Sequence, residues 1–204
     1  MKTRSAVAFI VGALSWSASE YAIHRFIGHG PRRKREPGLR GFVTPSGLAA
    51  AFNTEHLAHH SDPQYFASSF QKAIAAVVVT GVAAAVASAV AGSRRGCAFA
   101  LGFGLTYVSY EVLHRRVHTH APTTRYGRWR RRHHLYHHHQ TPRQNHGVTS
   151  ALWDYICGTK SALPQGQPLR VPRKLAPPWL IAPETGLVRP ELAADYVLVG
   201  SAGG

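Results

Sequence analysis

Three long uncharged runs constrain the fold of this chain more than any other feature. From residue 73 to residue 93 no charged residue occurs, and a helix needs ~20 apolar residues to cross the hydrocarbon core of a membrane. Residues 5–19 and 96–110 form shorter runs, and each reaches membrane length only by including one glutamate, Glu20 or Glu111. A glutamate near a helix end is tolerated at the interface or inside a bundle. The sequence therefore predicts an all-α integral membrane helical bundle of about three spans.

The first run has a second interpretation. Lys2 and Arg4 precede it, and small residues occupy positions 17–19 at its end, which is typical of a cleaved secretory signal. Cleavage there would cut the chain just before residues 20–29, which the candidate site described below requires. We therefore expect this helix to be retained.

The distribution of charge predicts the orientation. If all three runs span, residues 24–72 and 114–204 lie on one side of the membrane with most of the 24 lysines and arginines. Cytoplasmic segments carry an excess of these residues, so this side is predicted to be the cytoplasm.

The net charge of +15 does not by itself indicate a nucleic-acid partner. Lysines and arginines beside a membrane are attracted to anionic lipid by ~1 kcal/mol each, and no aromatic stacking surface or nucleic-acid motif accompanies them. We expect no nucleic acid to bind. With 45% hydrophobic residues and only two cysteines, intrinsic disorder, a disulfide scaffold and a zinc finger are excluded as well.

Histidines are the candidate functional residues. The chain has 14, all on the predicted cytoplasmic side, and most form four clusters at or shortly after the ends of the apolar runs. Positions three and four apart share one face of a helix, so within each of three clusters we expect the imidazoles to converge on one point. The four clusters are His24 and His29; His56, His59 and His60; His114 and His118; and His134, His137 and His138.

The spacing of the first cluster differs. His24 and His29 are five apart, which is off a single α-helical face. We expect a helix end whose next turn bends back, since Gly28 and Gly30 would permit such a bend.

Four clusters together indicate a metal site. A single histidine at a helix end is usually a polar interfacial residue, and a run such as 137–139 is usually a solvated or weakly metal-binding tract. Imidazole, however, is often unprotonated near neutral pH and suits Zn, Cu, Fe and Ni. One tetrahedral site needs ~4 ligands, whereas ten imidazoles are placed to converge here. The sequence therefore predicts a cytoplasmic histidine-rich centre for two metal ions.

The four clusters resemble the histidine boxes of the membrane fatty acid hydroxylase superfamily, which also holds sterol desaturases and related lipid oxygenases. Their order, spacing and membrane placement agree. Residues 20–25 (EYAIHR), 145–150 (NHGVTS), 152–154 (LWD) and 158–159 (GT) are similar to the family as well. The resemblance covers roughly residues 18–160, so we expect a hydroxylase-like domain over 1–160 and a proline-rich C-terminal tail over 161–204.

This resemblance implies an oxidoreductase with two iron ions that uses O₂ as co-substrate to hydroxylate a lipid, such as a fatty acyl chain. An unactivated C–H bond offers no handle for acid–base chemistry, so a metal cofactor must carry the reaction. A sterol or lipid desaturase and a carotenoid ring hydroxylase are alternatives within the same superfamily. No glycine-rich dinucleotide-binding motif follows a strand, so an external donor is implied, either a ferredoxin or a b-type cytochrome with its reductase.

A non-catalytic metal-binding membrane protein is the alternative from another class. A transporter should line its path through the bilayer with ionisable groups. Residues 73–93 carry none, and the histidines stop at one membrane face, which favours a surface site supplied from the membrane.

Two glutamates are candidate supports for the ligands. Glu20 precedes His24 by four residues, and Glu111 precedes His114 by three. Metal-bound histidines usually give their second N–H to a carboxylate or a carbonyl, although Glu111 could instead pair with Arg115 along its helix. Further candidates for a supporting role are His133, Asn145 and His146.

The tail allows several interpretations. Residues 161–204 hold more than half of the 13 prolines, which preclude a long helix. The tail could cover the site as a lid, dip into the membrane at Trp179, Leu180 and Ile181, or be disordered.

Overall fold

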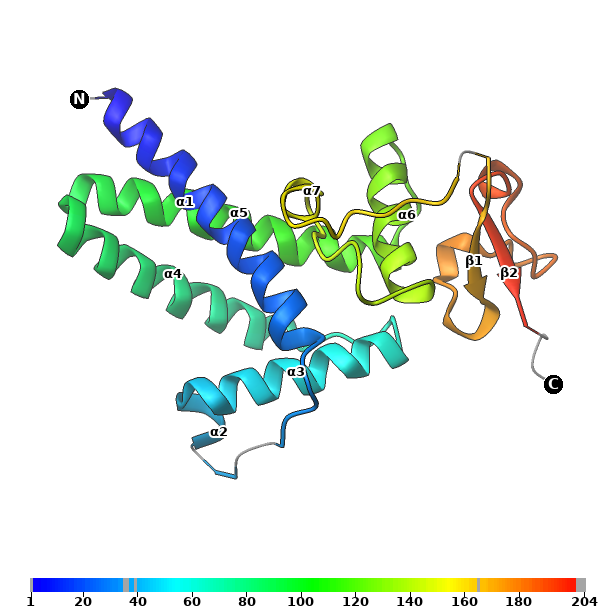
Figure 1. Cartoon of the computed structure of the whole chain (residues 1–204), viewed down its shortest axis with the longest axis horizontal. Helices are drawn as coiled ribbons and strands as arrows, with labels where there is room; N and C mark the ends of the chain where they lie inside the picture. Colours follow the sequence, from blue (N-terminus) through cyan, green and yellow to red (C-terminus); the bar gives the residue numbers. More distant parts are fainter. Residues whose placement is uncertain (1, 35–36, 39, 165, 201–204) are drawn as a thin grey trace. The chain divides into compact units, whose positions relative to one another are not determined.

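The computed structural model describes residues 2–34, 37–38, 40–164 and 166–200. It divides into two compact units, whose helices and strands are labelled in Figure 1. The first is built from Met1–Glu20 and Ala67–Leu113, and the second from Tyr21–Phe66 and His114–Gly204.

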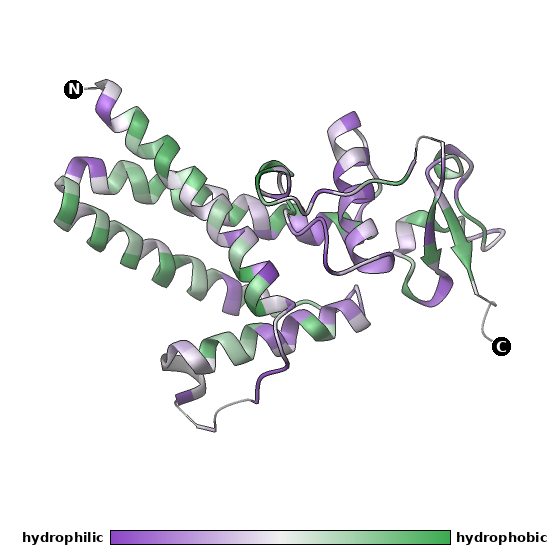
Figure 2. Ribbon diagram, viewed as in Figure 1, coloured by the Kyte–Doolittle hydropathy of each residue, from purple (hydrophilic) through white to green (hydrophobic). Residues whose placement is uncertain are grey.

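The three longest of the described helices match the three predicted spans. They are α1 (Lys2–Ala22), α4 (Ser69–Ala91) and α5 (Ser93–Thr119). All three helical stretches are long and apolar enough to cross a membrane, and α4 is hydrophobic along most of its length (Figure 2). None of the described residues of α4 is buried, as expected of a helix whose sides face lipid.

Within the first unit, small residues let the helices approach closely. A Cβ on Gly12 would lie 2.0 Å from the carbonyl oxygen of Phe99, and one on Gly102 would lie 2.0 Å from that of Phe9. Only glycine fits at such a contact between α1 and α5. About one turn after Gly12 on α1, Trp16 stacks on Tyr107 with ring centroids 4.2 Å apart.

The second unit carries the remaining helices. After α1 the chain continues as a π-helix, η1 (Ile23–Gly28), followed by α2 (Arg40–Val43), α3 (Pro45–Ser61), α6 (Arg125–His139) and α7 (Leu152–Ile156). Thr44 caps α3 by accepting the N–H of Gly47, and Thr124 caps α6 by accepting the N–H of Gly127, both at 3.0 Å. These caps satisfy backbone donors that the first turn of a helix leaves unpaired.

The C-terminal segment departs from the all-α prediction. Strands β1 (Leu169–Pro172) and β2 (Tyr196–Val199) form a two-stranded parallel sheet. Three short 3₁₀ turns lie between them, η2 (Arg173–Leu175), η3 (Pro178–Leu180) and η4 (Pro190–Leu192). Prolines are compatible with short edge strands and with the first positions of such turns, so this segment folds without a long helix.

The described residues of this segment pack into a core shared with α6, so for residues 166–200 the interpretations as a disordered tail and as a membrane dip are both wrong. Trp179 and Leu180 are 5% and 0% exposed and pack in a cluster with Leu135 of α6. The indole N–H of Trp179 donates to the carbonyl of Val117 at 2.9 Å. The segment therefore covers one side of the helix that carries the last histidine cluster. The division of the chain at residue 160 stays a prediction.

Candidate metal centre

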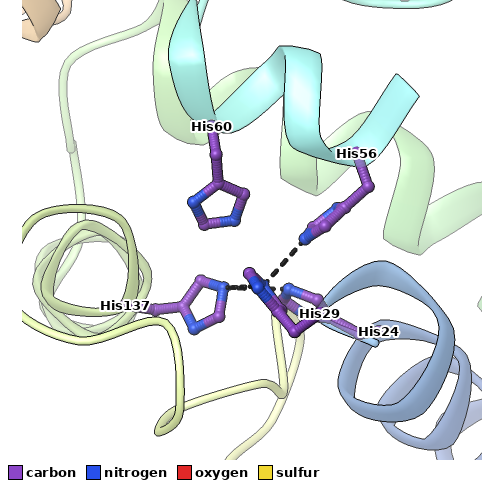
Figure 3. A group of neighbouring side chains, drawn as sticks. All are labelled: His24, His29, His56, His60 and His137. Atoms are coloured by element: carbon purple, nitrogen blue, oxygen red, sulfur yellow. Dashed lines mark hydrogen bonds between the residues drawn. The ribbon is translucent and has the colours of Figure 1, made fainter. Parts of the chain in front are cut away.

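All ten predicted histidines lie in the second unit, where they form two groups of five. In each group, one ring nitrogen of every histidine lies within 4.8 Å of those of the other four. The first histidine group is His24, His29, His56, His60 and His137 (Figure 3). The second histidine group is His59, His114, His118, His134 and His138.

The local winding of η1 explains how His24 and His29 meet. A π-helix bonds each N–H to the carbonyl five residues earlier, and the N–H of His29 donates to the carbonyl of His24 at 3.1 Å. Residues five apart therefore share a face here, and the two imidazoles lie with centroids 5.1 Å apart. The predicted bend after the helix end is thus replaced by a widened helical turn.

Gly28 makes room for the third ring of the first histidine group. A Cβ at this position would lie 2.8 Å from Cδ2 and 3.1 Å from Cγ of His56. Because His56 is buried, its ring has little space to retreat. The absence of a side chain on Gly28 therefore lets α3 bring His56 against η1.

Within each group the imidazole nitrogens face one another at close range. In the first, the Nε2 atoms of His24 and His137 are 3.0 Å apart, and those of His29 and His56 are 2.9 Å apart. In the second, the Nε2 atoms of His134 and His118 are 3.0 Å apart. Two nitrogens bound at right angles to one metal, with bonds of ~2.1 Å, would lie ~3.0 Å apart. The spacing therefore fits ligands that share an ion.

The protonation of two rings strengthens this conclusion. His24 Nδ1 lies 2.5 Å from the carbonyl oxygen of His146, and His137 Nδ1 lies 2.7 Å from that of Gln144. A carbonyl only accepts, so each Nδ1 carries the proton and donates. In the neutral imidazoles both Nε2 atoms then carry lone pairs, and these point at each other across 3.0 Å. Such an arrangement repels unless a cation lies between the two rings.

A third ring is oriented in the same way. His59 Nδ1 donates to the carbonyl of Tyr65 at 2.9 Å. Backbone carbonyls of Tyr65, Gln144 and His146 thus hold three of the ten imidazoles with their Nε2 atoms turned inward, the arrangement typical of metal-bound histidines.

Burial keeps these histidines neutral. Desolvation, followed by repulsion from His146, lowers the pKa of His29 to about 4. Desolvation and the neighbouring imidazoles, His29 first, lower the pKa of His60 to about 2. The pKa values of His56, His134, His137 and His138 are also held well below the ordinary value, with burial as the largest cause. Near neutral pH these rings keep a lone pair for a metal.

The chain matches one protein family over most of its length. Residues 9–159 fit the sequence model of the family described as fatty acid hydroxylase, and this span includes all ten histidines of the two groups. The chain belongs to the fatty acid hydroxylase family.

Relatives of this fatty acid hydroxylase family member are named for lipid hydroxylation. The fatty acid 2-hydroxylase of Rattus norvegicus is 30% identical over 155 residues, which cover 74% of this chain and 38% of that protein. The dihydroceramide fatty acyl 2-hydroxylase FAH2 of Arabidopsis thaliana is 26% identical over 149 residues, which cover 72% of this chain and 58% of that protein. The match thus covers less than two thirds of the length of either relative.

A solved structure has the same fold. It is described as full-length scs7p with only the hydroxylase domain visible, and it matches with a TM-score of 0.59 at 24% identity. The match covers 79% of this chain and 58% of that chain. At this identity the likeness supports the fold of this fatty acid hydroxylase family member and nothing finer.

One acid that the sequence did not single out organises the loop behind the first histidine group. Asp154, on α7, is fully buried and accepts the N–H of His146 at 2.8 Å, the N–H of Gly147 at 2.9 Å and the hydroxyl of Thr159 at 2.8 Å. Burial alone would raise its pKa, but these bonds and one with His133 hold the pKa below its ordinary value. Asp154 thereby positions the carbonyl of His146 toward His24.

Three predicted supporting residues lie near Asp154, with His133 on α6 and with Asn145 and His146 in the loop before α7. His133 Nε2 is 3.3 Å from Oδ2 of Asp154. Asn145 has φ +58° and exchanges hydrogen bonds with the backbone of Ser161, at 2.8 and 3.0 Å. His146 contributes its carbonyl to His24, and its own ring packs edge-on against that of His24. The family resemblance at residues 152–154 is the feature of the sequence that could have identified Asp154.

The two predicted glutamates lie in the first unit. Glu20 is buried, at 4% exposure. Glu111 forms an ion pair with Lys72 at 3.0 Å, which joins α5 to α4. The supporting role for either glutamate stays a prediction.

Proposed function

We propose that this chain is a membrane-bound lipid hydroxylase that oxidises a fatty acyl chain with O₂. The observation that carries the proposal is the pair of five-histidine groups, whose neutral imidazoles face one another at 2.9 to 3.0 Å in a chain of the fatty acid hydroxylase family.

The proposed cofactor is two iron ions, one for each histidine group. Five imidazoles exceed the ~4 ligands of a tetrahedral zinc site, and iron is among the metals that imidazole suits. When bound, iron would supply the O₂-dependent chemistry that an unactivated C–H bond requires. The ten proposed ligands are His24, His29, His56, His59, His60, His114, His118, His134, His137 and His138.

The chain's own residues hold the proposed ligands in position and keep their imidazoles unprotonated. Tyr65, Gln144 and His146 fix three rings through their carbonyls, so those ligands need not reorganise when a metal binds. Burial excludes water from the rings and keeps protons off them. Exclusion of water also limits hydrolytic side reactions at the site of an oxidising metal.

The proposed substrate is an acyl chain attacked at carbon 2, beside the acyl carbonyl. The names of the relatives support this choice, since both are 2-hydroxylases of fatty acids or fatty acyl groups. Three candidate spans support a membrane location, where such a substrate resides. The excess of lysine and arginine on the histidine side supports a cytoplasmic site, and a ferredoxin or a b-type cytochrome with its reductase is the proposed electron source.

The test is product formation from a defined lipid. Iron-loaded chain in detergent would be mixed with a ceramide or a free fatty acid, isotopically labelled O₂, NADPH, a ferredoxin and its reductase, and the lipid analysed by mass spectrometry. We expect one labelled oxygen at carbon 2. His137→Ala should abolish the product, whereas His120→Ala, an exposed histidine outside both groups, should retain it.

Two outcomes would contradict the proposed hydroxylation and favour an alternative. Loss of two hydrogens without gain of oxygen would identify a desaturase. Bound metal with no turnover of fatty acid, ceramide, sterol or carotenoid would support the non-catalytic metal-binding alternative.

A further inference from the structure

The first unit contains an apolar groove that the proposed reaction does not use. Its volume is about 620 Å³, within the ~300–1,000 Å³ range of small-molecule sites. It is lined by α1, α4 and the beginning of α5, and no histidine of either group takes part.

Helical spacing explains why its walls are aliphatic. On α1, Val7 and Val11 are four apart and share a face, and on α4 Val86 and Val90 do the same. These four valines are between 47% and 84% exposed. Phe99 of α5 also lines the groove.

The groove stays open because small residues face it from α4. Ala83 and Ala87 line it one turn apart, so no long side chain fills the space between α4 and α1. The close contact of α1 with α5 at Gly12 and Phe99 brings the backbones of these two helices together beside it. The result is a slot with hydrocarbon walls.

Two arginines line the same groove. Arg4 is near the start of α1 and Arg95 near the start of α5, and both are exposed. Among the described residues no ion pair involves either arginine. The acids of the first unit, Glu20 and Glu111, lie roughly four turns further along the same two helices. The groove thus combines apolar walls with two uncompensated positive charges.

We propose that this groove binds one anionic phospholipid, with an acyl chain along the valines and alanines and the phosphate between Arg4 and Arg95. Guanidinium groups bind phosphate oxygens through two parallel N–H bonds, and cations beside a membrane attract anionic headgroups. A zwitterionic lipid offers the same chain but adds a positive charge beside the two arginines. This lipid would be a structural ligand, separate from the substrate.

The experiment measures lipid retention by the full chain. Delipidated protein in detergent would be mixed with equal amounts of phosphatidylglycerol and phosphatidylcholine, and the bound lipid read by native mass spectrometry. We expect one phosphatidylglycerol per chain and at least about tenfold less phosphatidylcholine, as a difference of ~1.4 kcal/mol gives. Arg4→Gln combined with Arg95→Gln should remove the preference.

Matched variants separate the groove from general charge. Arg94→Gln removes the neighbouring charge, which does not line the groove, and should keep the phosphatidylglycerol. Ala87→Phe fills the groove without changing charge and should lose the phosphatidylglycerol, while thermal unfolding of both variants in detergent reports correct folding. Equal retention of the two lipids, or retention of phosphatidylglycerol by the double variant, would overturn the proposal. Preferential capture of a free fatty acid over phosphatidylglycerol in the same competition would also overturn it.

Discussion

The carboxylate of Asp154 accepts the backbone N–H of His146 at 2.8 Å, and the carbonyl of that same residue accepts Nδ1–H of His24. A buried acid on α7 thus reaches the first histidine group through a single residue, His146. Groups that orient metal-bound histidines typically contribute 10- to 100-fold to metal affinity.

Asp154→Asn should therefore weaken metal binding. The Asn side chain keeps one acceptor oxygen, but its NH₂ would face a backbone N–H, so a buried charge-assisted bond worth ~1.5–3 kcal/mol is lost. We expect the iron affinity of the first histidine group to fall about 10- to 100-fold, measured by titration of the metal-free chain with ferrous iron under anaerobic conditions.

Asp195→Asn is the matched control. Asp195 is partly exposed and pairs with Arg132 at 3.0 Å, and such pairs contribute at most ~1 kcal/mol. It should leave iron affinity unchanged. Wild-type affinity in Asp154→Asn would remove the positioning role of this residue.

Gly28→Ala should displace His56. The added methyl group would lie 2.8 Å from a ring carbon of that buried histidine, so the ring must move out of the first histidine group. We expect a loss of metal from this group with the second group retained. Gly81→Ala, on α4, where a Cβ meets nothing within 4 Å, should keep both metals and leave stability equal or higher by up to ~1 kcal/mol. Full metal occupancy in Gly28→Ala would contradict the packing described for η1 and α3.

Acid should destabilise the metal-free chain. Unfolded histidines have a pKa near 6.5, whereas in the fold the pKa is lowered to about 4 for His29 and about 2 for His60. Between the folded and the unfolded pKa of each histidine, the unfolded state binds more protons than the folded state. Their contribution to stability is therefore complete above the unfolded pKa and is lost as the pH falls through the folded pKa.

The measurement is the free energy of unfolding in detergent at a series of pH values, followed by tryptophan fluorescence. Stability should be nearly constant above about pH 7 and fall below it by ~1.4 kcal/mol per pH unit for each extra proton that the unfolded state binds. A flat profile between about pH 7 and about pH 4 would show that these rings are not buried in a neutral form.

The native cysteines offer a test of orientation. Cys157 follows α7 in the second unit and is exposed, on the side of the chain that we propose faces the cytoplasm. A membrane-impermeant maleimide should label it in inside-out vesicles and spare it in intact cells, with Cys157→Ser as the control for labelling of Cys97. Labelling of Cys157 in intact cells would reverse the proposed orientation.

Much of this arrangement follows from local sequence. Uncharged runs located the three long helices, and a spacing of four correctly placed His56 with His60 and His134 with His138. The prediction that whole clusters converge was wrong for His59 and His137, because each lies three residues from a neighbour on its helix and belongs to the other histidine group. The π-turn that joins His24 and His29 was not predicted, because it is a local widening of the helix and a spacing of five is off a single α-helical face. Carbonyl partners such as that of Gln144 were not predicted, because every residue has a backbone carbonyl and the sequence does not show which one faces a histidine.

The C-terminal segment shows a different limit. Its strands are four residues long, so the alternation of apolar and polar residues is too short to distinguish a strand from a loop. Leu169 and Leu180 are buried in a cluster that combines residues of this segment with Leu135 on α6. That contact is tertiary and leaves no periodic pattern in the segment itself.

The most direct test of the central claim is the iron content of the purified chain and of two variants, one from each histidine group. After anaerobic loading with ferrous iron, elemental analysis should give about two irons per chain, as expected for two imidazole-rich groups. His137→Ala and His118→Ala should each lose about one iron or more, and His120→Ala should lose none. If the wild-type chain binds no iron, or if both ligand variants keep the full amount, the two groups of five imidazoles are not a metal centre.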